Sequence, residues 1–156
     1  MIKVLFVCMG NICRSPMAEA VFQNLVNEAG LSDKILVDSA GTGGWHAGEP
    51  AHRGTLQVLK LHSIPYNGRA RQFTGSDLEQ FDYVLAMDTE NLSHIQRFAG
   101  KKAEVSLFLD YAGKAGIVDV SEVPDPYYDG RFEHVYELVT QGCKALLAHI
   151  RAEHGI

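Results

Sequence analysis

Residues 3–16 read KVLFVCMGNICRSP, and this stretch predicts a β-strand, a tight loop and a helix in direct succession. The run from Lys3 to Val7 is apolar and β-branched, which is typical of a buried strand. The loop that follows contains a glycine and ends at Arg14. Pro16 then suits the first turn of a helix, because an N–H at that position has no helical partner to lose.

Short apolar runs and helical patterns alternate along the rest of the chain. The sequence predicts strands over residues 3–7, 35–37, 83–86 and 105–109, and helices over residues 16–29, 54–62 and 89–98. The clearest helical periodicity lies near the C-terminus, in an apolar stripe made of Phe132, Val135, Val139, Cys143, Leu146 and Ile150. This alternation implies right-handed crossovers and a parallel sheet covered on both faces. In such sheets ligands bind at the carboxyl ends of the strands.

Size and composition limit the class of protein. With 156 residues, of which 46% are hydrophobic and 21% charged, residues 1–156 are expected to form a single domain. The net charge of −5 argues against nucleic acid or an anionic membrane as a partner, since both bind a basic face. The apolar run at residues 2–9 is too short to span a membrane. Three cysteines without disulfide-framework spacing suit a reducing compartment, so we expect a cytoplasmic protein.

The loop between Cys8 and Arg14 has the length and position of an anion-binding site. Five residues lie between the two and lead into a helix N-terminus: Met9, Gly10, Asn11, Ile12 and Cys13. Backbone N–H groups in such a loop turn inward, and the positive end of the helix dipole adds to them. A phosphate dianion can therefore be held without a broad basic surface. Gly10 and Asn11 tolerate the positive φ that a curled backbone requires.

Three side chains of this motif carry the expected chemistry. The field of the loop favours the thiolate of Cys8 over the thiol, which makes Cys8 a nucleophile at neutral pH. Arg14 has a planar fork of donors that can grip two phosphate oxygens and follow their charge into the transition state. Ser15 can donate its hydroxyl to the Cys8 sulfur and stabilise the thiolate, or it can simply cap the helix.

A general acid is expected far downstream, in the sequence Asp125-Pro126-Tyr127-Tyr128. Phosphoryl transfer to sulfur leaves a phenolate or alkoxide that needs a proton, and we assign this role to Asp125, which Pro126 holds in an extended conformation. The same carboxylate can then activate the water that hydrolyses phosphocysteine. We interpret Tyr127, Tyr128 and Trp45 as aromatic walls that select phosphotyrosine by its depth, although Trp45 suits a hydrophobic core equally well.

These residues together resemble a known family. Residues 7–16, VCMGNICRSP, are similar to the signature of low-molecular-weight protein tyrosine phosphatases, and residues 125–128, DPYY, resemble their second motif. Three intervening segments also resemble the family in order: residues 38–42, 70–72 and 81–88. The resemblance covers nearly the whole chain. It implies an α/β, three-layer sandwich with a four-stranded parallel sheet, helices on both faces, and a phosphate-binding loop between the first strand and the first helix.

The resemblance also implies a role for each site residue. The chain is expected to be a protein-tyrosine phosphatase that acts through phosphocysteine on Cys8, with Arg14 as phosphate clamp and Asp125 as general acid, and without a cofactor. The implied supporting residues are Asn11, Ser39 and Asp88, and Cys13 is the implied redox partner. Expected partners are phosphotyrosine-containing proteins, with a bacterial tyrosine kinase as the analogy, and a thiol reductant for reactivation.

Three positions bear on specificity and on departures from the family pattern. Ile12 favours tyrosine, because related protein-arginine phosphatases typically carry threonine there. His46, beside Trp45, lies in the loop that resembles the specificity wall of the family. Many eukaryotic members place a histidine before the Ala-Arg-Gln segment, whereas this chain has Asn67-Gly68-Arg69. What braces the phosphate loop at that point is therefore open.

The other cysteines and the histidines have modest expected roles. Cys13 is either a small buried residue or the partner of Cys8 in a reversible disulfide that intercepts oxidation. Cys143 lies on the apolar stripe and is expected to pack in the core. The seven histidines are scattered and the cysteines lack a close ligand pair, so we predict no metal. The glycines of residues 41–48 do not match a nucleotide-binding loop.

Two rival functions use the same loop differently. An arsenate reductase of related fold attacks arsenate with the same thiolate, but it needs two further cysteines on a mid-chain segment, and residues 68–104 contain none. A non-catalytic phosphotyrosine-binding module has no use for a nucleophile. The presence of both Cys8 and Asp125 therefore favours the phosphatase.

Overall fold

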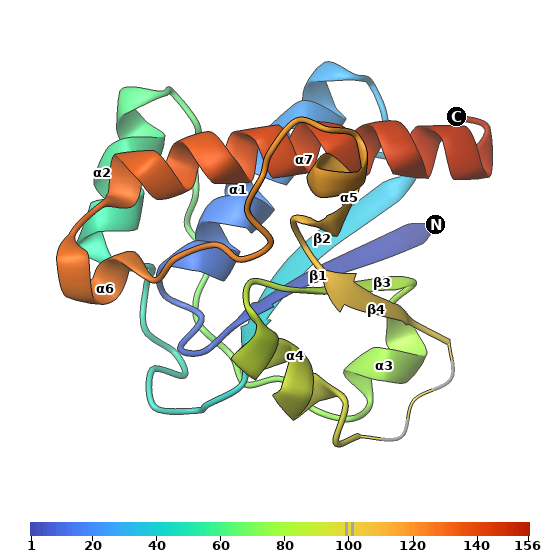
Figure 1. Cartoon of the computed structure of the whole chain (residues 1–156). Helices are drawn as coiled ribbons and strands as arrows, with labels where there is room; N and C mark the ends of the chain where they lie inside the picture. Colours follow the sequence, from blue (N-terminus) through green and yellow to red (C-terminus); the bar gives the residue numbers. More distant parts are fainter. Residues whose placement is uncertain (99, 101) are drawn as a thin grey trace.

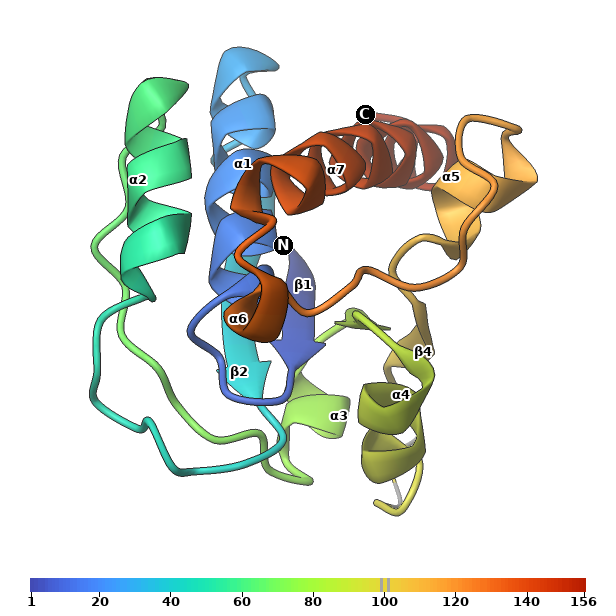
Figure 2. The ribbon, with the colours of Figure 1, turned by 60° about the vertical axis from the view of Figure 1, so that its left-hand side comes forward.

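The computed structural model describes residues 1–98, 100 and 102–156. Four strands form one sheet in the order β2-β1-β3-β4, and every neighbouring pair is parallel. Figures 1 and 2 show this sheet between two groups of helices. The elements in chain order are β1 (Ile2–Cys8), α1 (Arg14–Glu28), β2 (Ile35–Gly41), α2 (Arg53–Leu61), α3 (Asp77–Gln80), β3 (Tyr83–Ala86), α4 (Thr89–Ile95), β4 (Glu104–Leu107), α5 (Asp110–Lys114), α6 (Pro126–Asp129) and α7 (Phe132–His154).

The side chains of β1 alternate between two hydrophobic cores, as the period of a strand requires. Val4 and Phe6 face the larger core, which α1, α5 and α7 cover. The ring of Phe6 meets the rings of Phe22 and Phe108 edge to face, with centroids 5.6 and 5.4 Å apart. Leu5 and Val7 face the smaller core, which α3 and α4 cover. The expected α/β sandwich with helices on both faces of a four-stranded parallel sheet is confirmed.

The predicted element types hold, but several boundaries and short helices differ. Strand β3 has the predicted bounds, whereas β2 runs four residues beyond the prediction to Gly41, because its polar residues Asp38 and Ser39 have partners in the fold. Strand β4 ends at Leu107, and the buried pair Phe108 and Leu109 leads into α5 instead of extending the strand. Helix α4 ends at Ile95 rather than at residue 98. The short helices α3, α5 and α6 were not predicted.

Helix α7 confirms the C-terminal apolar stripe. Five of its six members are buried, and Phe132 at the start of the helix is partly buried. The stripe packs on α1 and α5, and Figure 1 shows α7 running across the sheet (red). Within the part of the chain that the structure describes, no helix has the length and apolar character needed to cross a membrane.

The chain changes direction at the centre of the sheet. After β1 it passes through α1 to β2 on one side, whereas β3 and β4 lie on the other side of β1. In open parallel sheets such a reversal leaves a crevice at the carboxyl ends of the central strands. The loop after Cys8 and the residues after Ala86 therefore meet at one edge of the sheet (Figure 2).

Candidate active site

The loop from Cys8 to Arg14 is curled at the carboxyl end of β1. Asn11 has a φ of 57°, in the left-handed region, which an asparagine tolerates better than most residues. The carbonyl oxygens of Cys8, Met9 and Ile12 accept hydrogen bonds from backbone N–H groups outside the loop, at 2.9, 2.9 and 2.7 Å. In contrast, no acceptor in the described part of the chain binds the backbone N–H groups of residues 9–13. These donors are therefore available to an anion, as a loop that enters a helix N-terminus provides.

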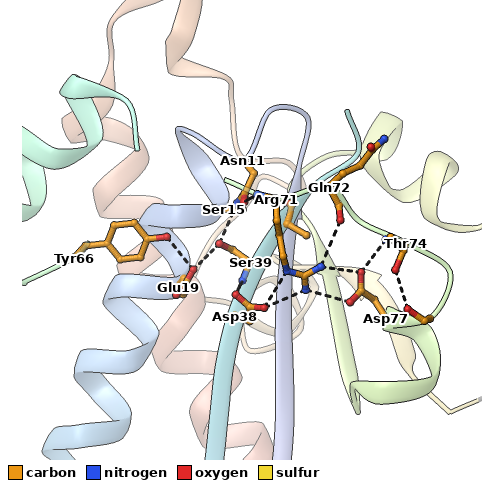
Figure 3. A network of polar contacts seen from close by, with 12 residues as sticks. Asn11, Ser15, Glu19, Asp38, Ser39, Tyr66, Arg71, Gln72, Thr74 and Asp77 are labelled. Atoms are coloured by element: carbon orange, nitrogen blue, oxygen red, sulfur yellow. Dashed lines mark hydrogen bonds and ion pairs between the residues drawn. The ribbon is translucent and has the colours of Figure 1, made fainter. Parts of the chain in front are cut away.

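Side chains beneath the loop join Cys8 to the second strand. The Sγ atom of Cys8 lies 3.0 Å from the Oγ of Ser15. Asn11 donates from Nδ2 to Ser15 Oγ at 2.7 Å and to Ser39 Oγ at 3.0 Å. Its Oδ1 accepts a bond from the backbone N–H of Arg71 at 3.0 Å. Every polar end of Asn11 thus has a partner, and the left-handed turn is fixed from below (Figure 3).

Arg14, the first residue of α1, is only 3% exposed and is held by two carboxylates. Its Nη1 donates to Asp88 at 2.7 Å and to the carbonyl of Val123 at 3.0 Å, and its Nη2 lies 3.7 Å from Asp125. Burial lowers the pKa of Arg14, but the charges of Cys8, Asp88 and Asp125 outweigh burial and raise it overall. The guanidinium is therefore a permanent, fixed cation beside the sulfur.

Asp88 and Asp125 each begin a short helix. Asp88 accepts the N–H of Asn91 at 2.8 Å at the start of α4. Asp125 accepts the N–H of Tyr127 at 3.0 Å, and Pro126 occupies the first turn of α6. Each carboxylate keeps one oxygen for Arg14. The capping bonds therefore orient both acids toward the phosphate loop.

A cavity of about 290 Å³ opens above the loop. It brings together eleven residues, of which ten are predicted catalytic, loop or wall residues, and its lining is Cys8, Met9, Gly10, Ile12, Cys13, Arg14, Trp45, His46, Asp125, Tyr127 and Tyr128. The rings of Tyr127 and Tyr128 lie 5.2 Å apart at 76°. Trp45 is 71% exposed, so the core interpretation of this residue is wrong. Asn11, Ser15 and Ser39 lie below the cavity, and Asp88 lies beside it, next to Arg14.

The three cysteines are free and differ in their surroundings. Burial, the charge of Cys8 and the charge of Asp125 raise the pKa of Cys13 to about 12, against the smaller opposite effect of Arg14. Cys143 is wholly buried and its Sγ lies 3.7 Å from the carbonyl of Ala18, in the core position that its periodicity predicts. Among residues 1–98, 100 and 102–156, no group of three or more His, Cys, Asp or Glu side chains is placed to hold a metal ion.

Sequence reasoning missed three residues that support the loop. Glu19 accepts hydrogen bonds from Ser39 at 2.5 Å and from Tyr66 at 3.0 Å. The guanidinium of Arg71 bridges Asp38 and Asp77, with contacts of 3.1 Å to each. The position of Glu19, one helical turn after Ser15, could have shown that it lies beneath the loop. Arg71 was noted only as part of a resembling segment, and the sequence near Tyr66 carries no signal of its contact.

Gly41, at the end of β2, lies directly under the phosphate loop. A Cβ atom at this position would be 2.9 Å from the carbonyl oxygen of Met9 and 3.0 Å from the carbonyl carbon of Gly10. Real Cβ atoms essentially never approach backbone atoms so closely. Glycine is therefore needed here for the close approach of two backbone segments.

Comparison with known proteins places the chain in one family. A family model described as low molecular weight phosphotyrosine protein phosphatase matches residues 3–155. The low molecular weight protein-tyrosine-phosphatase YfkJ of Bacillus subtilis is 50% identical over 156 residues, with 98% of each chain covered, and its crystal structure superposes with a TM-score of 0.93 over 98% of this chain and 96% of that one.

Two further matches differ in the substrate that their names give. PtpA of Staphylococcus epidermidis, named a low molecular weight protein-tyrosine-phosphatase, is 42% identical over 151 residues, covering 96% of this chain and 94% of PtpA. The crystal structure of DARP, a Drosophila arginine phosphatase, has a TM-score of 0.87 at 33% identity, covering 96% of this chain and 98% of that one. The curled loop has unpaired backbone donors and a buried arginine, and the family model and the relatives match nearly the whole length of the chain. The chain therefore belongs to the low molecular weight phosphotyrosine protein phosphatase family.

Proposed function

We propose that this protein-tyrosine phosphatase hydrolyses phosphotyrosine and small aryl phosphates through a covalent phosphocysteine on Cys8. The observation that carries the proposal is the convergence of three groups on one cavity: unpaired backbone N–H donors, the Cys8 sulfur, and the side chains of Arg14 and Asp125. The donors and Arg14 would bind the phosphate dianion, and the sulfur lies at the base of the same loop.

In the first half-reaction the Cys8 thiolate attacks phosphorus, and the bond between phosphorus and the tyrosine oxygen breaks. Asp125, in its acid form, gives its proton to the departing phenolate. Arg14 and the loop N–H groups stabilise the charge on the three equatorial oxygens in the transition state. The products are free tyrosine on the substrate protein and phosphocysteine on the enzyme.

In the second half-reaction water attacks the phosphorus of phosphocysteine. Asp125, now a carboxylate, accepts a proton from that water, and the phosphorus–sulfur bond breaks. The hydroxyl of Ser15, 3.0 Å from the Cys8 sulfur, stabilises the leaving thiolate. Inorganic phosphate leaves, and Asp125 is protonated again for the next cycle.

The aromatic walls support a substrate with a long aromatic side chain. Tyr127, Tyr128 and Trp45 rise above the loop, so a phenyl ring between them would bring its phosphate to Cys8, whereas the short phosphoserine side chain would not reach. Ile12 also lines the cavity, and its apolar side chain favours phosphotyrosine over phosphoarginine. A comparison of kcat/KM for the two phosphoamino acids, in the wild type and in Ile12→Thr, tests this preference.

The proposal extends to partners and location. Phosphotyrosine-containing proteins are the substrate class, and a bacterial tyrosine kinase is the proposed specific substrate. We place the enzyme in the cytoplasm, where a thiol reductant would reverse a disulfide between Cys8 and Cys13. All three cysteines are free in the structure.

Trapping the covalent intermediate tests the function directly. Purified enzyme is mixed with para-nitrophenyl phosphate, quenched with denaturant during turnover and digested with trypsin. Cys8 and Cys13 share the peptide of residues 4–14, so fragmentation must locate the added phosphate. We expect it on Cys8, and no adduct in Cys8→Ser. Release of phosphate without a Cys8 adduct would replace the covalent mechanism with direct attack by water.

Two further experiments test the rival functions. Saturable binding of a phosphopeptide without release of phosphate would indicate a binding module. Turnover of arsenate in the presence of thioredoxin, without phosphatase activity, would indicate a reductase.

A further inference from the structure

A polar chain runs from the Cys8 sulfur through the floor of the site and ends at Glu19. Its middle members are Ser15, Asn11 and Ser39, and Figure 3 shows Glu19 at the end, between Ser39 and Tyr66. Glu19 lies on α1, one turn after Ser15, and its Oε1 atom accepts both hydroxyl bonds. No step of the proposed mechanism uses Glu19 or Tyr66.

The charge of Glu19 fixes the direction of its bond with Ser39, and the backbone N–H of Arg71 fixes the orientation of the Asn11 amide. An ionised carboxylate only accepts hydrogen bonds, so Ser39 must donate its one proton to Glu19. The Ser39 oxygen can then only accept, and it does so from Asn11. The backbone N–H of Arg71 donates to the Asn11 oxygen, so the Asn11 amide gives its two N–H bonds to Ser39 and Ser15. Ser15 is left with its own proton, which it can give to the Cys8 sulfur.

We propose that Glu19 and Tyr66 are positioning residues for Cys8: the ionised Glu19 carboxylate, held by the Tyr66 hydroxyl, fixes Ser39 as an acceptor for Asn11, which in turn holds the Ser15 hydroxyl beside the thiolate. The inference rests on the proposed role of Cys8 as nucleophile and leaving group. Neither residue touches the substrate. Both act on the rate through the stability of the thiolate that attacks and departs.

The surroundings of Glu19 raise its pKa overall, and the Tyr66 hydroxyl is one of the groups that oppose this rise. Burial raises the pKa of Glu19, and the bonds from Ser39 and Tyr66 oppose this rise. The charged groups that face Glu19 also differ in sign, because Asp38 on β2 raises its pKa and Arg71 lowers it. Burial and the Glu19 charge raise the pKa of Tyr66, so that Tyr66 stays protonated and remains a donor. A protonated Glu19 would instead donate to Ser39, so the Ser39 hydroxyl proton would lose its acceptor and the acceptor that Ser39 offers to Asn11 would be less firmly held.

The absence of a side chain at residue 68 leaves room for the contact between Tyr66 and Glu19. A Cβ atom on Gly68 would lie 2.3 Å from the Tyr66 hydroxyl oxygen and 2.6 Å from its ring carbon. Gly68 therefore leaves the space that the hydroxyl of Tyr66 occupies. This accounts for how the loop is supported in a chain that has glycine at this position.

The experiment compares the pH dependence of kcat/KM for para-nitrophenyl phosphate in the wild type and Tyr66→Phe. Removing the hydroxyl removes a bond that keeps Glu19 ionised, so its pKa rises and the active form is lost at a higher pH. We expect roughly a three- to tenfold loss near pH 5 and a much smaller loss near neutral pH, since one pKa unit corresponds to tenfold. Gly68→Ala should displace the hydroxyl and give the same profile.

A double mutant separates positioning from a general loss of structure. Glu19→Gln removes the titrating group, so its loss of kcat/KM should be independent of pH, and adding Tyr66→Phe should add no pH-dependent loss. The rate of Cys8 alkylation by iodoacetamide at a fixed pH should fall in Glu19→Gln, because less sulfur is present as thiolate. Tyr136→Phe is the matched control, because the Tyr136 ring stacks on His62, a residue outside the site, and its profile should equal that of the wild type.

The inference and the proposed function fail in different ways. If Tyr66→Phe retains the wild-type pH profile, or loses activity uniformly in step with a lower melting temperature, the positioning role is refuted while phosphate can still be trapped on Cys8. If no phosphate is trapped on Cys8 in the wild type, the proposed function itself is refuted.

Discussion

The floor and the rim of the cavity differ in almost every physical property. The floor consists of the phosphate loop and the side chains beneath it, in which Asn11 and Arg14 are each 3% exposed and Ser15 is fully buried. The rim consists of Trp45, Tyr127 and Tyr128, which are 71%, 52% and 77% exposed. Floor side chains have several hydrogen-bond partners each, whereas the rim presents aromatic rings to solvent.

This difference assigns the two regions different tasks. A floor whose donors are fixed before the substrate arrives needs little reorganisation as charge develops, which is the arrangement that stabilises a transition state. An exposed rim can accept different peptides around the same phosphotyrosine, because its contacts are adaptable. We therefore expect changes to Arg14 and to the side chains beneath the loop to act on kcat, and changes in the rim to act on KM.

The largest effect is expected from Arg14→Lys, which removes the planar guanidinium group from the floor. Lysine keeps the charge but cannot contact Asp88, Val123 and two phosphate oxygens with one planar group. We expect kcat for para-nitrophenyl phosphate to fall about 10²- to 10³-fold, as when one preorganised donor is removed. Arg151→Lys, at the far end of α7, is the matched control and should be unchanged. A loss of less than about tenfold would mean that charge alone is sufficient.

The next effect, from Asp125→Asn, depends on the leaving group. An amide cannot protonate a phenolate, so kcat should fall roughly 10²-fold or more for phosphotyrosine, and much less for aryl phosphates whose leaving groups need no proton. Kinetics across a series of aryl phosphates measures this slope. Asp129→Asn, in the same short helix α6, serves as control. Equal slowing for all leaving groups would remove Asp125 as the acid.

A smaller effect is expected from Tyr128→Ala, which changes only the rim. Loss of one aromatic contact of about 0.5–1.5 kcal/mol should raise KM for a phosphotyrosine peptide roughly two- to tenfold. The value of kcat and the melting temperature should remain close to those of the wild type, because the side chain is 77% exposed. A fall in kcat without a change in KM would contradict the division between floor and rim.

The smallest effect concerns Cys13, a floor residue that the first half-reaction does not use. Because its pKa is raised to about 12, Cys13 is a neutral thiol at neutral pH and should gain reactivity only as the pH approaches that value. Iodoacetamide near neutral pH should therefore modify Cys8 and leave Cys13 intact, as fragmentation of the peptide of residues 4–14 can show. Cys13→Ser should keep kcat but recover less fully after peroxide. Equal labelling of both cysteines would contradict the conclusion that burial raises the pKa of Cys13.

The central strands and the loop could be predicted because their signals are local. Tyr83–Ala86 lies in a short apolar run between Asp82 and Asp88, and β3 has the predicted bounds. The strand–loop–helix of residues 3–16 is read from apolar character, one glycine and one proline, all adjacent in sequence. Helix α6 was missed although its signal was present, since Asp125 followed by Pro126 is a capping residue followed by a preferred first helical residue.

The support of the loop could not be predicted, because it depends on contacts between distant residues. Strand β2 continues through Asp38 and Ser39 in register with β1, and Arg71 and Asn11 come from other parts of the chain to bind the two side chains. Tyr66 contacts Glu19 across 47 residues of sequence. Such pairs have no period and no fixed spacing, so composition and patterning do not show them.

Gly41 is a position of low mutational tolerance, although it takes no part in the chemistry. It neither attacks, donates a proton nor contacts phosphate through a side chain, yet even one added carbon would push against the Met9 carbonyl, 2.9 Å away. In a saturation survey scored by activity, residue 41 should thus rank beside Cys8 and Arg14 among the positions that accept no replacement. The range of sequences open to this active site is limited by clearance between backbones as much as by reactivity.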